Sequence, residues 1–179
     1  MSRTVLRFFA LALALAAMDG ARAQTITTEA IVKAAFLYKF AGYVEWPSSA
    51  FPAPDTPIVI GVNGADEVAG ELERLVPGRN VNGRQVLVRR VREEGIRGVH
   101  VLFVGRGAAD APALVRAGQQ QGALVVTEVD RGLELGSAIN FVPVEDRIGF
   151  DVSLDNAEKA GLRISARMLP VARKVIVRP

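Results

Sequence analysis

The chain has 179 residues, of which 50% are apolar, and this suffices for one domain of ordinary size but not for two. It contains no cysteine, so disulfides, thiolate nucleophiles and cysteine-based zinc sites are excluded. The formal net charge is +3, whereas nucleic-acid-binding surfaces carry a clustered excess of positive charge, so we expect no nucleic-acid partner.

Residues 1–23 have the composition of a secretory signal peptide. Arg3 and Arg7 give the positive start, an apolar stretch of 11 residues follows, and Ala-Arg-Ala at the end is an A-x-A cleavage site. A membrane-spanning helix needs about 20 apolar residues, so neither this stretch nor any later one is expected to span a bilayer. We predict a mature chain of residues 24–179, with a net charge of +1, in the periplasm of a Gram-negative cell.

The mature chain opens with a helical pattern. Residues 31–41 carry apolar side chains at helical spacing, with Lys33 and Lys39 expected to point toward water. The helix is predicted to end near Trp46, because Pro47 forces the residue before it out of the α region. A loop is expected to follow.

Strands and helices are predicted to alternate along the next part of the chain. Short apolar runs bounded by glycine, proline or asparagine are typical of strands, and apolar residues three or four apart are typical of helices. We predict helices over residues 66–75 and 110–119, and strands over residues 58–62, 85–91, 99–104 and 123–129.

The last part of the chain completes the predicted fold. Residues 138–144 and 147–154 flank a Pro-Val-Glu-Asp sequence, which predicts a hairpin. Asp155, with a glutamate three residues later, is predicted to cap a helix. A last helix is expected over residues 162–177, kinked or split at Pro170. The whole pattern predicts an α/β fold, a single three-layer α/β/α sandwich with a mixed, mostly parallel sheet and a late antiparallel hairpin.

Few residues stand in patterns typical of catalysis. His100, the only histidine, lies in an apolar strand, where a core histidine with local hydrogen-bond partners is more common than a general base or metal ligand. Glycines at residues 61–64 and 105–107 follow strands, but they lack the lysine of a phosphate-binding loop and fit tight strand-to-helix turns. We therefore predict no catalytic residue, no cofactor and no metal site.

Four side chains are candidates for binding a partner or ligand: Trp46, Arg147, Arg163 and Arg167. Trp46 is the only tryptophan, a residue type enriched at binding hot spots, although packing at a helix end is more common. Arg163 and Arg167 are one turn apart on the predicted last helix, where they would either grip an acidic group or form a solvated face. Arg147 begins the second hairpin strand and is either a ligand contact or a cross-strand partner.

Two blocks of the chain carry specific motifs. The first is AIVKAAFLYKF at residues 30–40, leading to VEWP at residues 44–47, and the second is the pattern INF…R…F…AGLRIS over residues 139–165. Three strand segments between them agree in order, at residues 58–62, 81–86 and 100–104. In these segments, which cover nearly the whole mature chain, the sequence resembles the YfiR family of periplasmic regulators.

The resemblance implies a three-layer α/β fold in a regulator that is not an enzyme. The best-known members repress YfiN-type enzymes, because they bind the periplasmic domain of an inner-membrane diguanylate cyclase and hold it inactive. Release raises cyclic di-GMP and favours biofilm growth. We therefore expect a repressor that contacts its partner through Trp46, Arg163 and Arg167. We also expect the fold to fix the positions of Lys33, Tyr38 and Asn140.

Two departures from the family pattern matter. Members of this type form disulfides, and this cysteine-free chain cannot use them to sense redox state. Pro170 lies where the family usually continues a basic helix, and Ala166 replaces a serine shortly before it.

Other hypotheses stay open at the level of the sequence. The runner-up is a periplasmic small-molecule-sensing or carrier module, in which an arginine beside an aromatic ring holds a small carboxylate ligand. A hydrolase that uses His100 is the third. The ridge of Phe36 and Phe40 either packs inside the domain or pairs with a second copy to form a homodimer.

Overall fold

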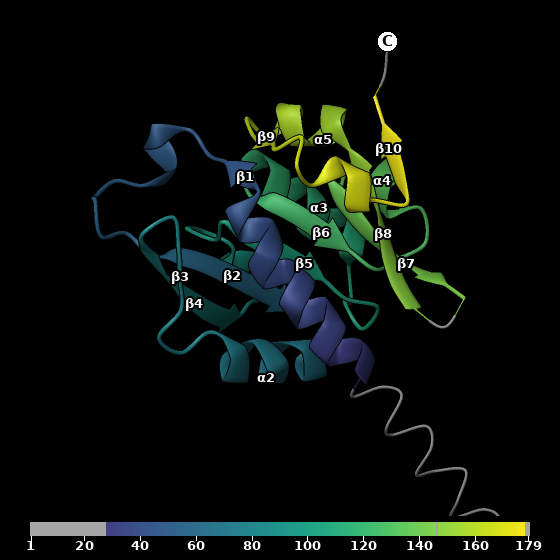
Figure 1. The fold of residues 1–179 in the computed structure, drawn as a ribbon, viewed down its shortest axis with the longest axis horizontal. Helices are drawn as coiled ribbons and strands as arrows, with labels where there is room; N and C mark the ends of the chain where they lie inside the picture. Colours follow the sequence, from purple (N-terminus) through teal and green to yellow (C-terminus); the bar gives the residue numbers. More distant parts are fainter. Residues whose placement is uncertain (1–27, 146, 178–179) are drawn as a thin grey trace, which may run out of the picture.

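The computed structural model of the protein describes residues 28–145 and 147–177 (Figure 1). The predicted signal peptide lies outside the described residues. The first described element is a helix over residues 28–42, called the first helix below. The strands after it are β1 (Val44–Glu45), β2 (Ile58–Asn63), β3 (Asn80–Val81), β4 (Arg84–Arg90), β5 (Val101–Val104), β6 (Leu124–Thr127), β7 (Ile139–Val144), β8 (Arg147–Ser153), β9 (Arg163–Ile164) and β10 (Lys174–Ile176). The helices after it are α2 (Asp66–Leu75), α3 (Ala111–Gln120), α4 (Gly132–Leu135) and α5 (Leu154–Lys159), with 3-10 turns η1 (Ser48–Ala50), η2 (Glu93–Gly95) and η3 (Leu169–Val171).

Eight strands form one sheet in the order β10-β8-β7-β6-β5-β2-β4-β3. Strands β7, β6, β5, β2 and β4 run parallel to one another. Strand β8 is antiparallel to β7, and β3 is antiparallel to β4. A separate antiparallel pair joins β1 to β9. The pairings confirm the predicted mixed, mostly parallel sheet with its late hairpin.

The sheet is covered on both faces, which confirms the three-layer sandwich. Along β5, Val101 and Phe103 face the core beneath the first helix and α2, whereas Leu102 and Val104 face the core beneath α3. This alternation follows from the period of two along a strand, which sends successive side chains to opposite faces. All four side chains are buried, as expected for a central parallel strand.

Four phenylalanine rings fix the first helix to the β7–β8 hairpin. Phe36 and Phe40 come from the helix, Phe141 from β7 and Phe150 from β8. The ring centroids of Phe40 and Phe150 are 4.9 Å apart and those of Phe36 and Phe150 are 5.3 Å apart, in the edge-to-face geometry that aromatic pairs favour. The ridge of Phe36 and Phe40 therefore packs inside the domain, which is the first of the two alternatives considered for it.

The predicted last helix is wrong. Its residues form β9, the turn η3 and β10 instead. Two partners far away in the sequence decide this outcome, because β9 pairs with β1 and β10 pairs in parallel with β8. Pro170 lies in η3, where its missing N–H costs no helical hydrogen bond. The β-branched run Val175, Ile176 and Val177 also favours a strand locally.

Two smaller predictions also need correction. The cap of α5 is Ser153 rather than Asp155, because the Ser153 hydroxyl accepts a hydrogen bond from the Asn156 N–H at 3.3 Å. His100 precedes β5 instead of lying within it. The first helix ends at residue 42, four residues before the predicted end at Trp46. The other predicted strands and helices are present, with ends shifted by at most two residues.

The aromatic packing of the first helix gives a stability prediction. Phe40 is 1% exposed, so Phe40→Ala should lower the free energy of unfolding by about 3–5 kcal/mol through lost burial and a cavity. Ile31→Ala on the same helix is the matched control, because Ile31 is 49% exposed and its truncation should cost about 0.5 kcal/mol or less. Urea denaturation measures both values. Equal losses in the two variants would show that the ring cluster does not hold the helix.

Candidate functional site

The short β1–β9 sheet brings together three of the four predicted binding residues. Arg163 lies on β9, directly opposite Glu45 on β1, and Trp46 follows β1 at once. Arg167 lies in the turn after β9, and its guanidinium carbon is 6.0 Å from the centroid of the Tyr43 ring. We call these three residues, Trp46, Arg163 and Arg167, the β1–β9 surface.

Both arginines of the β1–β9 surface are exposed. Among the described residues, no carboxylate lies within ion-pair distance of either guanidinium. The helical turn expected between Arg163 and Arg167 is absent, and strand pairing with β1 sets their position instead. These two guanidinium groups, without a carboxylate at ion-pair distance, can donate bidentate hydrogen bonds to carboxylates of a partner.

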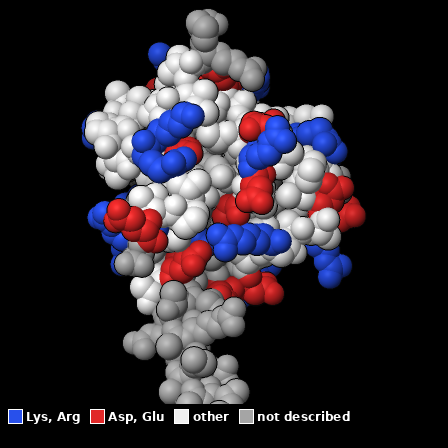
Figure 2. All heavy atoms as spheres, turned by 90° about the vertical axis from the view of Figure 1, so that its right-hand side faces the viewer, with Lys and Arg blue, Asp and Glu red and all other residues white. Residues whose placement is uncertain are grey.

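Arg147 lies apart from this surface. It opens β8 at the tip of the hairpin, opposite Val144 of β7, and the tip projects on the other side of the molecule from β1 and β9 (Figure 1). Figure 2 shows the molecule from the hairpin side, where basic and acidic side chains are interspersed. The position at the start of a paired strand fits the cross-strand interpretation of Arg147.

Trp46 packs into an aromatic cluster beneath the loop that follows β1. The ring centroids of Trp46 lie 6.1 Å from those of both Phe51 and His100, and the Phe51 and His100 rings stack at 4.7 Å. The guanidinium carbon of Arg84 lies over the Phe51 ring, 4.0 Å from its centroid. Within the described part of the chain, the buried indole Nε1 of Trp46 has no hydrogen-bond partner. Trp46 is partly buried, so part of its ring packs within the chain and only the remaining surface is available to a partner.

His100 fastens the same loop to the sheet. The Val59 N–H donates to Nδ1 at 3.1 Å, so the neutral ring carries its proton on Nε2, which donates to the Ala50 carbonyl at 3.1 Å. Burial lowers the pKa of His100 below its ordinary value of 6.5. Both ring nitrogens are engaged in fastening the loop, which favours the core-histidine interpretation over the general base.

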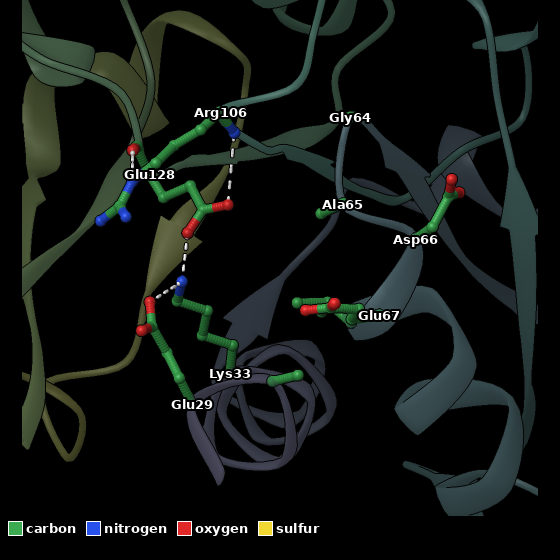
Figure 3. A pocket seen from close by; sticks show the side chains of 10 residues that line it. Glu29, Lys33, Gly64, Ala65, Asp66, Glu67, Arg106 and Glu128 are labelled. Carbon is green, nitrogen blue, oxygen red and sulfur yellow. Dashed lines mark hydrogen bonds and ion pairs between the residues drawn. The ribbon is translucent and has the colours of Figure 1, made fainter. Parts of the chain in front are cut away.

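A cleft of about 360 Å³ opens at the carboxyl ends of β2, β5 and β6 (Figure 3). Open α/β sheets usually bind ligands at such a position, where the strand order reverses. Lys33 forms the floor with 4% exposure, and it is ion-paired with both Glu29 and Glu128. The Arg106 N–H donates to Glu128 at 3.3 Å, so the same carboxylate also ties down the loop after β5.

The buried position of Lys33 corrects the prediction that it points toward water. A sign was present in the sequence, because Lys33 has the helical spacing of Ala30, Ala34 and Leu37, which are all buried. Its partner Glu128 lies 95 residues away, and no local pattern reveals such a pair. Lys39, which lies on another side of the helix, is exposed as predicted.

The two glycine segments beside the cleft pack against each other. Gly64 has a φ of +69°, and a Cβ there would lie 2.2 Å from the backbone nitrogen of Ala108. A Cβ at Gly105 would lie 2.4 Å from the Gly64 carbonyl oxygen. The backbone of one turn therefore occupies the space next to the other, and this confirms the interpretation as tight turns.

A comparison with protein-family models decides the family. The YfiR/HmsC-like model matches residues 30–173. The chain belongs to the YfiR/HmsC-like family. Among curated proteins, no sequence matches this chain. None of the helices in the described ranges has the length and hydropathy that a bilayer-spanning segment requires.

The first specific motif of this YfiR/HmsC-like chain now has a structural basis. Residues 30–40 supply the buried Lys33, the ring of Phe40 and the face that covers the sheet. The following VEWP segment supplies β1 and Trp46, and the closing AGLRIS segment supplies β9. The two motif blocks that identify the family are thus joined in space through β1 and β9.

The Lys33–Glu128 pair gives a second stability prediction. Lys33→Met leaves the nearly buried Glu128 without its cation, and this should cost about 3–5 kcal/mol of unfolding free energy. The double variant Lys33→Met/Glu128→Gln should recover a large part of that loss, because the only charge that it leaves without Lys33 is Glu29, whose side chain is 31% exposed. A double-mutant cycle by urea denaturation measures the coupling, with exposed Lys39→Met as control. Strictly additive losses would contradict a coupled pair.

The lowered pKa of His100 predicts a pH dependence of stability. As pH falls through 6.5 the unfolded chain takes up a proton on its only histidine, whereas the folded chain resists it. Stability contributed by neutral His100 is therefore complete above pH 6.5 and decreases below it, by at most about 1.4 kcal/mol per pH unit. Urea denaturation at several pH values between about 5 and 7 measures the slope. His100→Gln should lose this slope, and an unchanged slope in the variant would assign it to other groups.

Proposed function

We propose that the chain is a periplasmic regulator that binds the periplasmic domain of an inner-membrane diguanylate cyclase and holds that enzyme inactive. The observation that carries the proposal is membership of the YfiR/HmsC-like family over residues 30–173. The regulator acts by binding rather than by catalysis, because it lowers cyclic di-GMP through preference for the inactive state of its partner. Each tenfold preference requires about 1.4 kcal/mol of differential binding energy.

The β1–β9 surface is the proposed contact. Arg163 and Arg167 are exposed and have no carboxylate partner among the described residues, so a partner's acidic side chains could form bidentate bonds with them. Trp46 follows Glu45, the residue opposite Arg163, and the part of its ring that is not packed on Phe51 and His100 could add apolar area of the kind found at hot spots. Arg147, on the other side of the molecule, belongs to this interface only if the partner also reaches the hairpin (Figure 1).

A small carboxylate is the second candidate ligand, and one contact favours it. The guanidinium of Arg167 lies over the Tyr43 ring, the arrangement that the sensor hypothesis requires. Arg84 has a comparable contact with Phe51, but it already donates hydrogen bonds to the carbonyls of Ala53, Pro54 and Thr56. A carboxylate ligand would therefore bind at Arg167 and would tune the same surface.

The input signal differs from the redox input of disulfide-forming relatives. The chain has no cysteine, so oxidation of its own thiols cannot control release of the partner. A ligand or a change in the partner itself must take that role.

The test combines capture of the membrane partner with measurement of cyclic di-GMP in cells. Tagged protein is crosslinked in cell envelopes, bound proteins are identified by mass spectrometry, and cyclic di-GMP is measured in cells that lack the native gene and carry each variant. Arg163→Glu/Arg167→Glu should capture at least about tenfold less diguanylate cyclase than the unmodified chain and should fail to lower cyclic di-GMP. Arg116→Glu is the matched control, because Arg116 is an exposed arginine on α3, across the sheet from the first helix.

The other outcomes are equally informative. Capture of a different membrane sensor, such as a histidine kinase, would keep a regulatory role and overturn the cyclase as partner. A thermal shift with small carboxylates, abolished by Arg167→Glu, together with capture of no membrane protein, would favour the small-molecule module. Equal capture by the double variant and the control would remove the β1–β9 surface from the interface.

A further inference from the structure

Strand β4 leaves one edge of the main sheet largely open. Strand β3 pairs only with the first two residues of β4, Arg84 and Gln85. From Val86 to Arg90 the strand pairs with β2 on its inner side, and the described residues place no strand on its outer side. We call residues 86–90 the open edge of β4.

The backbone of the open edge is oriented to accept another strand. The Val86 N–H points outward, because it donates to the Arg79 carbonyl, and the Val91 N–H points inward, because it donates to the Val62 carbonyl. Since backbone groups alternate along a strand, Val88 and Arg90 present their N–H and C=O groups outward. Such a row of unpaired groups is a template for strand addition.

The features that usually protect an edge are absent from the centre of this one. The register with β2 is continuous from Val86 to Arg90, so no bulge interrupts the strand. The central Val86, Leu87 and Val88 carry neither a proline nor a charge, and Leu87 is 41% exposed. The open edge therefore has an apolar centre that an added strand could cover.

The charge around the open edge selects the partner. Residues 79–92 contain five arginines and no acidic residue. Arg90 is already paired with Asp66 and Glu73, at 2.9 Å and 3.1 Å. In contrast, Arg89 donates to the carbonyl of Arg97, and no described carboxylate lies within ion-pair distance of either residue. At the end of the strand, Arg89 thus keeps an exposed guanidinium with no ion-pair partner among the described carboxylates.

We propose that the open edge of β4 binds an extended segment of a protein partner, which adds to the sheet as a further strand with an apolar centre and acidic ends. Main-chain hydrogen bonds to Val88 and Arg90 supply affinity, and Leu87 and the arginines supply specificity. This contact is separate from the β1–β9 surface and does not depend on the identity of the cyclase. An anionic membrane would match the charge but would leave the outward N–H and C=O groups unused.

The test uses two acidic peptides that differ only in their ability to pair. The probe has two glutamates at each end and a Val-Thr-Val-Thr centre, and the control peptide has prolines in place of the threonines, which removes backbone donors. Fluorescence anisotropy with the purified protein measures binding. The probe should bind at least about tenfold more tightly than the control peptide, and Arg89→Glu should weaken it by at least about tenfold, whereas Arg116→Glu should not.

A structural readout separates strand addition from charge attraction. In the ¹⁵N-labelled protein, the probe should slow amide exchange at the outward N–H groups of Val88 and Arg90 and leave Val104, on a central strand, unchanged. Equal binding of the two peptides, or no change at Val88, would overturn the proposal in favour of non-specific attraction. Tighter binding to vesicles of anionic lipid than to the probe would overturn it in favour of a membrane contact.

Discussion

The packing of the first helix on the sheet is the contact on which the rest of this structure depends. Phe36 and Phe40 lie among the rings of the β7–β8 hairpin, and Lys33, one turn earlier, is held by Glu128 at the carboxyl end of β6. The helix is therefore held at two places along its length, by ring contacts at one and by an ion pair at the other. Because β1 follows this helix directly, the same contacts also set the position of Trp46 and of the strand that β9 joins.

In this regulator, the charged groups that stabilise the fold are different from those that are exposed to a partner. Its buried charges, such as Lys33 and Glu128, are satisfied within the chain, as low-dielectric surroundings demand. Its exposed arginines, such as Arg167 and Arg89, have no carboxylate at ion-pair distance among the described residues. Arg167 lies in the turn after β9, and Arg89 lies on β4 of the main sheet. A partner that bound at both places would gain affinity from two modest contacts, and the loss of either contact would weaken the binding.

The cleft at the carboxyl ends of the strands lies where many α/β proteins bind a ligand, but here its side chains are engaged within the chain. Parallel α/β sheets often hold phosphates there, on glycine-rich turns at helix N-termini. In this chain the turns at Gly64 and Gly105 contact each other, and Lys33 is already bound to two carboxylates. The cleft at this location therefore stays open, but its lysine and its glycine turns are already engaged within the chain.

The sequence by itself determined most helices and strands as far as the hairpin, but not β1, β3 and α4. It also determined the covered parallel sheet, the tight glycine turns and the family. These features depend on local periodicity, on turn residues and on motifs, and each is written within a short stretch of chain. Only the tertiary structure decided that Lys33 is buried, that residues 163–164 and 174–176 form strands, and that Arg163 pairs with β1. The physical reason is that a buried charge or an edge strand is stabilised by a partner distant in sequence. Glu128, β1 and β8 supply those partners, and nothing in the local pattern of the chain identifies them.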